Sequence, residues 1–368
     1  MMLGIFLERH REKKSLHNSK DNFKPPVSVI IPVHNEILRI NDLLESLEKQ
    51  DYENAEYIFI DDRSEDDSLA ILESFAEKIN NTATGNGVFY SNKVKIISLT
   101  ENPGPNCKQY ALGRGIENAG GEYILFTDAD CKMEKSWITG MVRRLSEADT
   151  GAIIAPVFKI PEGRNFFQMY QCFEHGIRFV YLAGATGLGA AGGGFGNNLI
   201  FKKSCLQMAG GYDNIEFSAT EDAALLSAIR ALRKYKIRAV LGKDVHVETR
   251  GEKNWKDLVN QNLRWNNGGL FSRDLLTRIN FNFLMITIGM GIIGIPLMLI
   301  LPSIWPLPLA VIISMSFNSI ANLCLFRTSL PKNSFAYGVN LLFTPAYFTF
   351  LTIIGFLGIK SDWKGKKL

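Results

Sequence analysis

The sequence lacks the features that would place it in several common classes of protein. Its 368 residues carry 41 Lys and Arg against 37 Asp and Glu, and a net charge of +4 is too small to indicate a nucleic-acid partner. The five cysteines are odd in number and never spaced as CxxC, and the five histidines show no HExxH pattern. These absences argue against a disulfide framework and a zinc site, and they indicate reduced thiols in a cytosolic environment.

A secretory signal is also missing. The apolar run Met1–Leu7 is too short for a signal-peptide core, and the charged residues 8–14 end it at once. We therefore expect residues 1–24 to form a charged N-terminal tail, either loosely held or on a membrane surface. The first 280 residues are expected to stay in the cytoplasm.

Charge is nearly absent from the last part of the chain. Between Phe281 and Ile359 the only charged side chains are Arg327 and Lys332. Three apolar stretches, each about long enough to cross a hydrocarbon core of ~30 Å, cover 281–301, 304–326 and 338–359. These stretches predict a transmembrane region of two to three segments over 281–359, and hence a multi-pass protein of the cell membrane. Long helices buried in a soluble core are the alternative.

The number of crossings stays open at this stage. Three full crossings would place the basic tail, residues 360–368, outside the cell, against the positive-inside rule. A break of the third stretch at Pro345 into a re-entrant hairpin would return that tail to the cytoplasm.

Apolar runs typical of buried strands alternate with amphipathic, helix-like runs over residues 25–250. The strand-like runs cover 27–33, 57–60, 94–99 and 123–127, and the helix-like runs cover 39–50, 68–79 and 108–118. This alternation predicts a doubly wound α/β domain, with a parallel sheet covered on both faces. Residues 80–92 are polar and predict a surface loop.

Two further segments follow in the second half of the chain. The glycine-rich segment 184–196 favours either a close approach of the backbone to a ligand or a flexible loop. Residues 251–280 predict an interface segment, with one amphipathic helix over 255–272.

Five polar motifs stand in a fixed order, and the early ones follow strand-like runs, where an α/β sheet exposes its ligand-binding edge. They are Pro32 with Glu36, Asp61-Asp62, Asp128-Ala129-Asp130, Glu221-Asp222, and the QxxRW set Gln261, Arg264 and Trp265. Alternate side chains of an extended segment share a face, so the carboxylates of Asp128 and Asp130 can point at one cation.

The last motif combines a cation and an aromatic ring on one helical face. Gln261, Arg264 and Trp265 stand at i, i+3 and i+4. A guanidinium suits a diphosphate, and an indole offers a flat surface to a sugar ring. Each motif also has a plainer interpretation: a solvated turn, a helix cap, or a Trp–Arg anchor in lipid headgroups.

The ordered set, over residues 25–270, resembles the family 2 glycosyltransferases, in the membrane-bound branch with cellulose and hyaluronan synthases and ceramide glucosyltransferase. The resemblance implies a GT-A-like nucleotide-diphospho-sugar transferase domain over 25–250. It implies that Asp128 and Asp130 hold Mg²⁺ or Mn²⁺, and that Asp222, beside Glu221, is the catalytic base. The implied contacts of the donor are Pro32, Glu36, Asp61, Asp62, Lys108 and Asp128; those of the diphosphate and acceptor are Gln261, Arg264 and Trp265.

The loop before Lys108 departs from the family pattern, because more residues than usual separate Asn102-Pro103-Gly104 from that lysine. An exposed lysine at a helix start is therefore the alternative for Lys108.

The expected function is inverting transfer of a sugar from a nucleoside-diphosphate-sugar, a UDP-sugar by family prevalence, to a lipid or membrane-associated glycan. The rival hypotheses are a non-catalytic membrane scaffold or channel subunit, a processive polysaccharide synthase, and a nucleotidyltransferase. Two or three crossings are few for a polysaccharide conduit, which favours the addition of one or a few sugars to a lipid.

Overall fold

The computed structural model describes residues 1–19, 23–82, 93–103, 106–327, 334–363 and 366–367. Residues 83–92 of the predicted surface loop, and residues 364–365 and 368 of the predicted basic tail, lie outside the described residues. All five cysteines fall within the described ranges and are free thiols.

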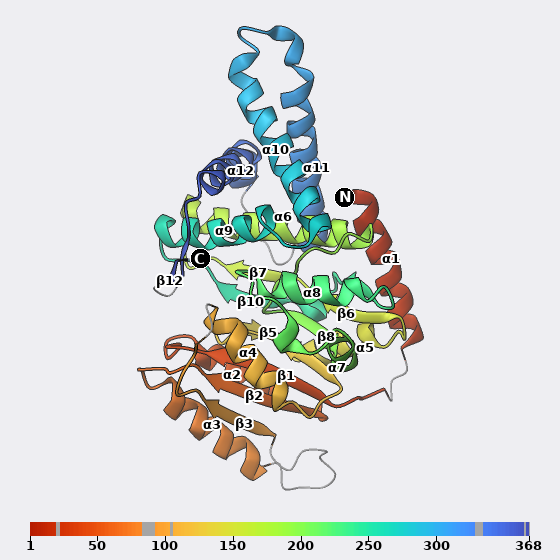
Figure 1. Cartoon of the computed structure of the whole chain (residues 1–368), viewed down its shortest axis with the longest axis vertical. Helices are drawn as coiled ribbons and strands as arrows, with labels where there is room; N and C mark the ends of the chain where they lie inside the picture. The colour runs from red at the N-terminus through yellow and green to blue at the C-terminus, as the bar shows by residue number, and fades with distance from the viewer. Residues whose placement is uncertain (20–22, 83–92, 104–105, 328–333, 364–365, 368) are drawn as a thin grey trace.

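A seven-stranded sheet forms the centre of the first domain (Figure 1). Its order is β3-β2-β1-β4-β8-β6-β9. The strand bounds are β1 Val27–Val33, β2 Ala55–Asp61, β3 Val94–Ser98, β4 Tyr123–Phe126, β6 Thr150–Ile154, β8 Leu199–Lys202 and β9 Lys236–Ala239. The central strands are apolar along nearly their whole length because both faces of the sheet are covered.

The sheet is mixed, so the expectation of a parallel sheet is wrong for one strand. β8 runs antiparallel to both β4 and β6, whereas the other neighbours are parallel. β8 enters the sheet from the segment that ends at Asn198, whose carbonyl accepts a hydrogen bond from Ala155, just past the end of β6. A strand that starts at the carboxyl edge of its neighbours has to run back against them.

The three helices predicted for residues 39–118 are present, within a few residues of their expected bounds, as α2 Ile40–Glu48, α3 Ser68–Thr82 and α4 Cys107–Glu117. The later helices are α5 Trp137–Leu145, the short α7 Lys203–Met208 after β8, and α8 Glu221–Ala231. α4 lies tightly on the sheet, since a Cβ at Gly115 would stand 2.4 Å from Ile30 Cγ2. This close packing fixes the N-terminus of α4 above the ends of β1 and β2.

A three-stranded sheet, β5-β10-β7, lies beside the main sheet. Its strands are β5 Cys131–Met133, β7 Val157–Ile160 and β10 Val247–Arg250. β5 follows Asp130 directly, and its pairing sets Cys131 opposite Thr249. Residues from the two halves of the domain therefore meet at the Asp128–Asp130 segment.

Two long helices, α6 and α9, lie between the sheets and the apolar C-terminal region (Figure 1). α9, Trp255–Leu270, is the predicted amphipathic helix, whereas α6, Phe166–Gly187, is not expected from the sequence. The first residues of the predicted glycine-rich segment belong to the last turn of α6, and the remainder, from Leu188, is not helical.

The N-terminal segment is a packed helix, α1 (Met2–Asn18), rather than the loosely held tail that we expected. α1 lies against α6 at a backbone distance that only glycine allows: a Cβ at Gly4 would stand 1.9 Å from the carbonyl oxygen of Gly184. Its acidic side chains Glu8 and Glu12 are buried and accept hydrogen bonds from the backbone of residues 239–242. Those long-range partners order the segment.

Three helices in the described part of the chain are long and apolar enough to cross a membrane. They are α10 Leu275–Leu297, α11 Pro306–Phe326 and α12 Ser334–Phe356. α10 and α11 form an upright hairpin, whereas α12 is seen almost end-on near its base (Figure 1). α12 continues through Pro345 as one helix, so the chain does not form a re-entrant hairpin at that proline.

Candidate active site

A cavity of about 480 Å³ opens where the carboxyl ends of β1 and β4 meet α6, α8 and α9. It brings together nearly all the side chains that the sequence analysis selected, although they come from six separate segments. The cavity is lined by Pro32, Glu36, Asp62, Lys108, Asp128, Asp130, Glu221, Asp222, Gln261, Arg264 and Trp265. Asp61 is not among the described residues that line the cavity. It is buried at the end of β2, where it is only 3% exposed.

Asp128 and Asp130 lie side by side after β4, each with its own partner. Lys108 Nζ lies 2.6 Å from Asp128 Oδ1, and Thr249 Oγ1 donates a hydrogen bond of 2.9 Å to Asp130 Oδ2. Arg39 Nη1 lies 3.6 Å from that same oxygen of Asp130. Burial and the neighbouring charge of Asp128 raise the pKa of Asp130, and Thr249, Arg39 and Lys108 oppose that shift only in part.

The carboxylate of Asp62 is held just after the carboxyl end of β2. Its Oδ1 pairs with Arg63 Nε at 3.0 Å, and its Oδ2 accepts a hydrogen bond of 3.0 Å from Asn102 Nδ2. The backbone N–H of Glu36 donates to Ser68 Oγ at 2.9 Å, which fixes the turn after β1. Asp62 and Glu36 thus face the cavity from two adjacent strand ends.

Lys108 joins two predicted motifs. Besides its pair with Asp128, its Nζ lies 3.5 Å from Glu221 Oε1 at the start of α8. Burial alone would lower the pKa of Lys108, but the carboxylates of Asp128 and Glu221 outweigh that effect and raise it. The lysine is therefore charged and internal, not an exposed lysine at a helix start.

Asn106 positions the start of α8, a role that the sequence analysis missed. Its Oδ1 caps α4 by accepting from the N–H groups of Lys108 and Gln109. Its Nδ2 donates to Ser218 O at 2.8 Å and to Glu221 Oε2 at 3.4 Å. The motif Asn-x-Lys in front of an apolar helix is the local signal that could have indicated this cap.

Asp222 stands next to Glu221 in the first turn of α8 and faces the cavity. Burial and the charge of Glu221 raise the pKa of Asp222 to about 7, although Lys108 and Arg264 act in the opposite direction. A carboxyl group with a pKa near the working pH is suited to accept a proton from a hydroxyl. The residue predicted as base therefore has the protonation behaviour that this role needs.

The QxxRW residues all point from α9 into the cavity. Arg264 Nη1 donates to Ala219 O at 2.8 Å, directly before α8. Burial lowers the pKa of Arg264, and the nearby carboxylates of Glu221 and Asp222 oppose that shift. Gln261 accepts a hydrogen bond of 2.7 Å from Lys159 Nζ and donates one of 2.6 Å to Glu252 Oε1.

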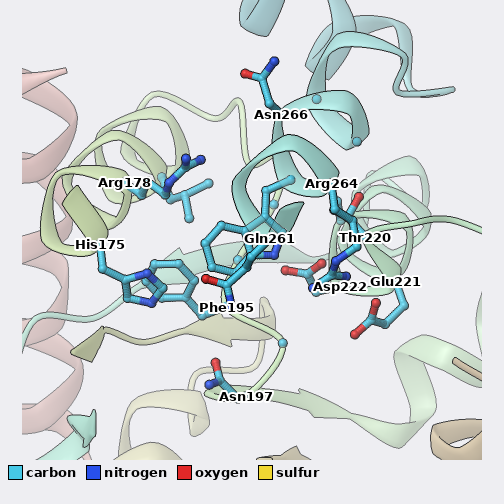
Figure 2. A pocket seen from close by; sticks show the side chains of 18 of the residues that line it. His175, Arg178, Phe195, Asn197, Thr220, Glu221, Asp222, Gln261, Arg264 and Asn266 are labelled. Atoms are coloured by element: carbon cyan, nitrogen blue, oxygen red, sulfur yellow. The ribbon is translucent and has the colours of Figure 1, made fainter. Parts of the chain in front are cut away.

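A second group of lining residues was not predicted. His175 and Arg178 come from α6, Lys159 from β7 and Phe195 from the glycine-rich segment. Figure 2 shows His175, Arg178 and Phe195 on one side of Gln261, with Glu221, Asp222 and Arg264 on the other. Gly192, Gly193, Gly194 and Gly196 also line the cavity, so of the two interpretations of this segment the close approach to a ligand site agrees with the structure.

The residues present fit a divalent cation at Asp128 and Asp130. Among the described residues, no three His, Cys, Asp or Glu side chains group as a complete ligand set. Mg²⁺ and similar hard ions commonly take only one or two protein carboxylates and complete their shell with phosphate oxygens and water. At this end of the cavity the carboxylates outnumber the cations Arg39, Lys108 and Arg264, so a bound diphosphate would need added positive charge.

Comparison with known proteins identifies the kind of domain. The profile of "Glycosyl transferase family 2" matches residues 28–207, and that of "Glycosyl transferase family group 2" matches residues 123–357. The chain is 28% identical over 144 residues to the glycosyltransferase GlyG of Streptococcus pneumoniae, which covers 39% of this chain and 43% of GlyG. It is 26% identical over 287 residues to the probable glycosyltransferase YdaM of Bacillus subtilis, which covers 74% of this chain and 62% of YdaM.

A solved structure shares the fold over nearly the whole chain. The mannosyltransferase PcManGT of Pyrobaculum calidifontis, solved in complex with GDP-Man and Mn²⁺, superposes with a TM-score of 0.55. The identity is 18%, and the match covers 96% of this chain and 95% of that one. This likeness confirms the GT-A-like α/β fold. The chain spans less than two thirds of the length of the two curated relatives.

Proposed function

Because the chain belongs to glycosyl transferase family group 2, we propose that it is an inverting, metal-dependent glycosyltransferase that acts at the cytoplasmic face of the cell membrane. The donor is a nucleoside-diphosphate-sugar, with a UDP-sugar as the first candidate, and the acceptor is a lipid or a membrane-associated glycan. One observation carries the proposal: a single cavity joins Asp128 and Asp130 to the proposed base, Asp222, whose pKa is raised to about 7.

The cavity supports a single displacement. The acceptor oxygen forms a bond to the anomeric carbon while the bond from that carbon to the diphosphate oxygen breaks. The acceptor proton passes to the carboxylate of Asp222, and the nucleoside diphosphate leaves with the bonding electrons. Attack opposite to the leaving group inverts the anomeric centre.

Two cations can stabilise the departing diphosphate. Lys108 lies between Asp128 and Glu221, and Arg264 is held by Ala219 O beside the same carboxylates. A divalent ion bound by Asp128 and Asp130 would add charge neutralisation at the leaving group. The donor nucleoside is proposed to contact Pro32, Glu36 and Asp62 at the strand ends, with Asp61 behind them.

The membrane region is proposed to cross the bilayer twice. α10 follows α9 directly, and after α12 the carbonyl of Ile359 accepts a hydrogen bond of 3.3 Å from Asn267 Nδ2 on α9. A chain that leaves and returns at the same level crosses an even number of times. α10 and α11 are then the crossing pair and α12 lies near their base, which keeps the basic tail in the cytoplasm and satisfies the positive-inside rule.

The apolar surface of the hairpin supports a bilayer environment. Large side chains stand exposed along both helices, for example Phe283 of α10 at 73% and Phe317 of α11 at 54%. Such a surface would be costly in water. A non-catalytic scaffold is the weaker hypothesis, because such a protein does not need a carboxyl group with a pKa near 7 in the same cavity as a pair of carboxylates. A single hairpin is also a small conduit for a processive synthase.

The first test is donor hydrolysis by the detergent-purified protein, screened with UDP- and GDP-sugars in the presence of Mn²⁺ or Mg²⁺. Nucleotide release with one donor, lost in Asp130→Ala and on chelation, is the expected result. Donor binding measured by titration in the same preparation separates a missing acceptor from a missing activity. A protein that neither binds nor hydrolyses any donor would contradict the proposed function.

A further inference from the structure

The part of the cavity beyond Gln261, away from Asp128 and Asp130, has a distinct chemistry. We call it the acceptor chamber, and it is defined by His175, Arg178, Phe195, Gln261 and Trp265. Its side chains come from α6, α9 and the glycine-rich segment (Figure 2).

The chamber adjoins the proposed base. The ring of Phe195 stacks on that of His175 with centroids 4.3 Å apart and an interplanar angle of 6°. The next residue, Gly196, lies so close to α8 that a Cβ there would stand 3.4 Å from Asp222 Cβ. Consecutive residues of one segment thus touch the chamber and the base, so a group in the chamber is next to Asp222.

The charges of the chamber are balanced internally. Arg178 Nε pairs with Glu174 Oε1, and the side chain of Glu174 is fully buried. Lys159 Nζ donates to Gln261 Oε1 at 2.7 Å and to Gln171 Oε1 at 3.3 Å, and the charges of Glu174 and Glu252 act on it. Among the described residues of this region, Arg178 and Lys159 are thus each compensated by nearby carboxylates, and burying a phosphate without an uncompensated cation is costly.

The chamber has unsatisfied hydrogen-bond donors as well as unsatisfied acceptors. Among the described residues, His175 Nδ1, Arg178 Nη2 and Glu174 Oε2 are buried without a hydrogen-bond partner. Burial, together with Lys159 and Arg178, lowers the pKa of His175 well below its usual value, so its neutral ring has one donor and one acceptor. A hydroxyl group, which also donates and accepts, matches this set better than an anion does.

The same cavity continues into the apolar C-terminal helices. Its far end is lined by Leu284, Met285 and Ile288 of α10, Met315 of α11 and Phe348 of α12. The chamber therefore lies between a polar reaction centre and an apolar end between the proposed membrane helices. A ligand that fills both parts has to be amphiphilic.

From these observations we infer that the acceptor chamber binds the uncharged, hydroxyl-bearing headgroup of a lipid, whose apolar chain leaves between α6, α10 and α11. This inference rests on the proposed function and specifies its acceptor. The lipid hydroxyl oxygen bonds to the anomeric carbon of the donor, its proton goes to Asp222, and the nucleoside diphosphate is released. The headgroup packs against the aromatic rings of Phe195 and Trp265, and it forms a hydrogen bond with the unpartnered Nδ1 of His175.

The test uses pairs of lipids that differ in a phosphate, presented to the full-length protein in phosphatidylcholine nanodiscs with the donor that it hydrolyses. The pairs are diacylglycerol with phosphatidic acid, ceramide with ceramide 1-phosphate, and oleyl alcohol with oleyl phosphate. We expect labelled sugar to enter at least one neutral lipid about tenfold or more faster than its phosphate partner. Transfer to phosphate lipids only would overturn the inference and leave the proposed function intact. Transfer to soluble glycan only, or to water only, would overturn the inference and contradict the proposed acceptor as well.

Two variants report on the chamber itself. His175→Phe keeps the stacked ring and removes the nitrogen atoms, and it is expected to raise the KM for the neutral lipid about tenfold, the effect of one lost hydrogen bond. Glu174→Gln leaves Arg178 without its carboxylate and is expected to raise relative transfer to the phosphate partner about tenfold. Donor binding, measured by titration, should be unchanged in both variants and shows that each is folded.

The matched control is His246→Phe. His246 is also buried and packs against the ring of Phe158 at an interplanar angle of 55°, but it is not among the described residues that line the cavity. It should leave the KM for the lipid unchanged. Equal effects of His175→Phe and His246→Phe, or no effect of His175→Phe on that KM, would contradict the assignment of the chamber.

Discussion

The substitution Asp222→Asn tests the proposed base and the origin of its pKa together. Asparagine keeps the shape of the side chain but can neither take up a proton nor carry a charge. If Asp222 is the base, turnover should fall by about 100-fold or more. The wild-type rate should also rise with pH through about 7, because only the ionised carboxylate can accept the acceptor proton. About one tenth of the molecules are ionised at pH 6 and about nine tenths at pH 8.

The same variant should affect stability in the opposite direction. Burial and Glu221 hold the pKa of Asp222 at about 7 in the folded chain, against an ordinary value of 3.8. A carboxyl group with a raised pKa favours the folded state while it is protonated, and that contribution is lost as the pH rises through about 7. At roughly 1.4 kcal/mol per pH unit, the loss has an upper bound of about 4 kcal/mol. Asp222→Asn does not undergo this pH-dependent loss of stability, because asparagine does not ionise.

The assay is a thermal unfolding series of wild type and Asp222→Asn in detergent from pH 5 to pH 8, beside kcat/KM over the same range. The stability difference in favour of the variant should grow with pH, and the pH-dependent limb of the residual activity should disappear. The control is Asp213→Asn, an exposed aspartate near the start of α8. Turnover of Asp222→Asn within a few-fold of wild type, or an unchanged limb, would refute the reasoning.

Three further predictions concern the donor end and the packing of α1. Lys108→Met should raise the KM for the donor by about 10-fold or more, because it leaves Asp128 and Glu221 without their shared cation; an unchanged KM in steady-state kinetics would argue against a role at the diphosphate. Chelation should abolish donor hydrolysis, Mn²⁺ or Mg²⁺ should restore it, and Asp130→Ala should prevent the restoration; activity that survives chelation would contradict metal dependence. Gly187→Ala should lower the unfolding temperature by several degrees, because its Cβ would stand 2.0 Å from the carbonyl oxygen of Gly4, whereas Gly163→Ala, with no atom within 4 Å, should not.

The strands and the first motifs could be predicted because the sequence encodes them locally. Runs such as 27–33 and 123–126 are almost entirely apolar, and the carboxylates within three residues after them mark the edge of the sheet. Strand direction is not encoded in such a run. The antiparallel course of β8 depends on where the preceding segment returns to the sheet, and the sequence of Leu199–Lys202 contains no trace of it.

α6 shows a second limit of sequence patterns. It is buried on most sides, against α1, β7, α11 and α12, so its residues lack the periodic polar face that identifies a helix. His175 and Arg178 therefore could not be assigned to a site before the helix itself was known. The packing of α1 could not be predicted for the opposite reason: its many charged residues suggest a solvated tail. Glu8 and Glu12 are nevertheless buried, because their hydrogen-bond partners lie more than two hundred residues away in the sequence.

The two glutamates of α1 have a consequence for how the protein avoids self-association. β9 is the last strand of the main sheet, and an open strand edge is a template for pairing with another chain. Glu8 accepts from the N–H of Ala239, and Glu12 accepts from those of Leu241 and Gly242, at 2.9 to 3.0 Å. α1 thus occupies backbone N–H groups that an incoming strand would use, and this disfavours the pairing of β9 with a strand of another chain.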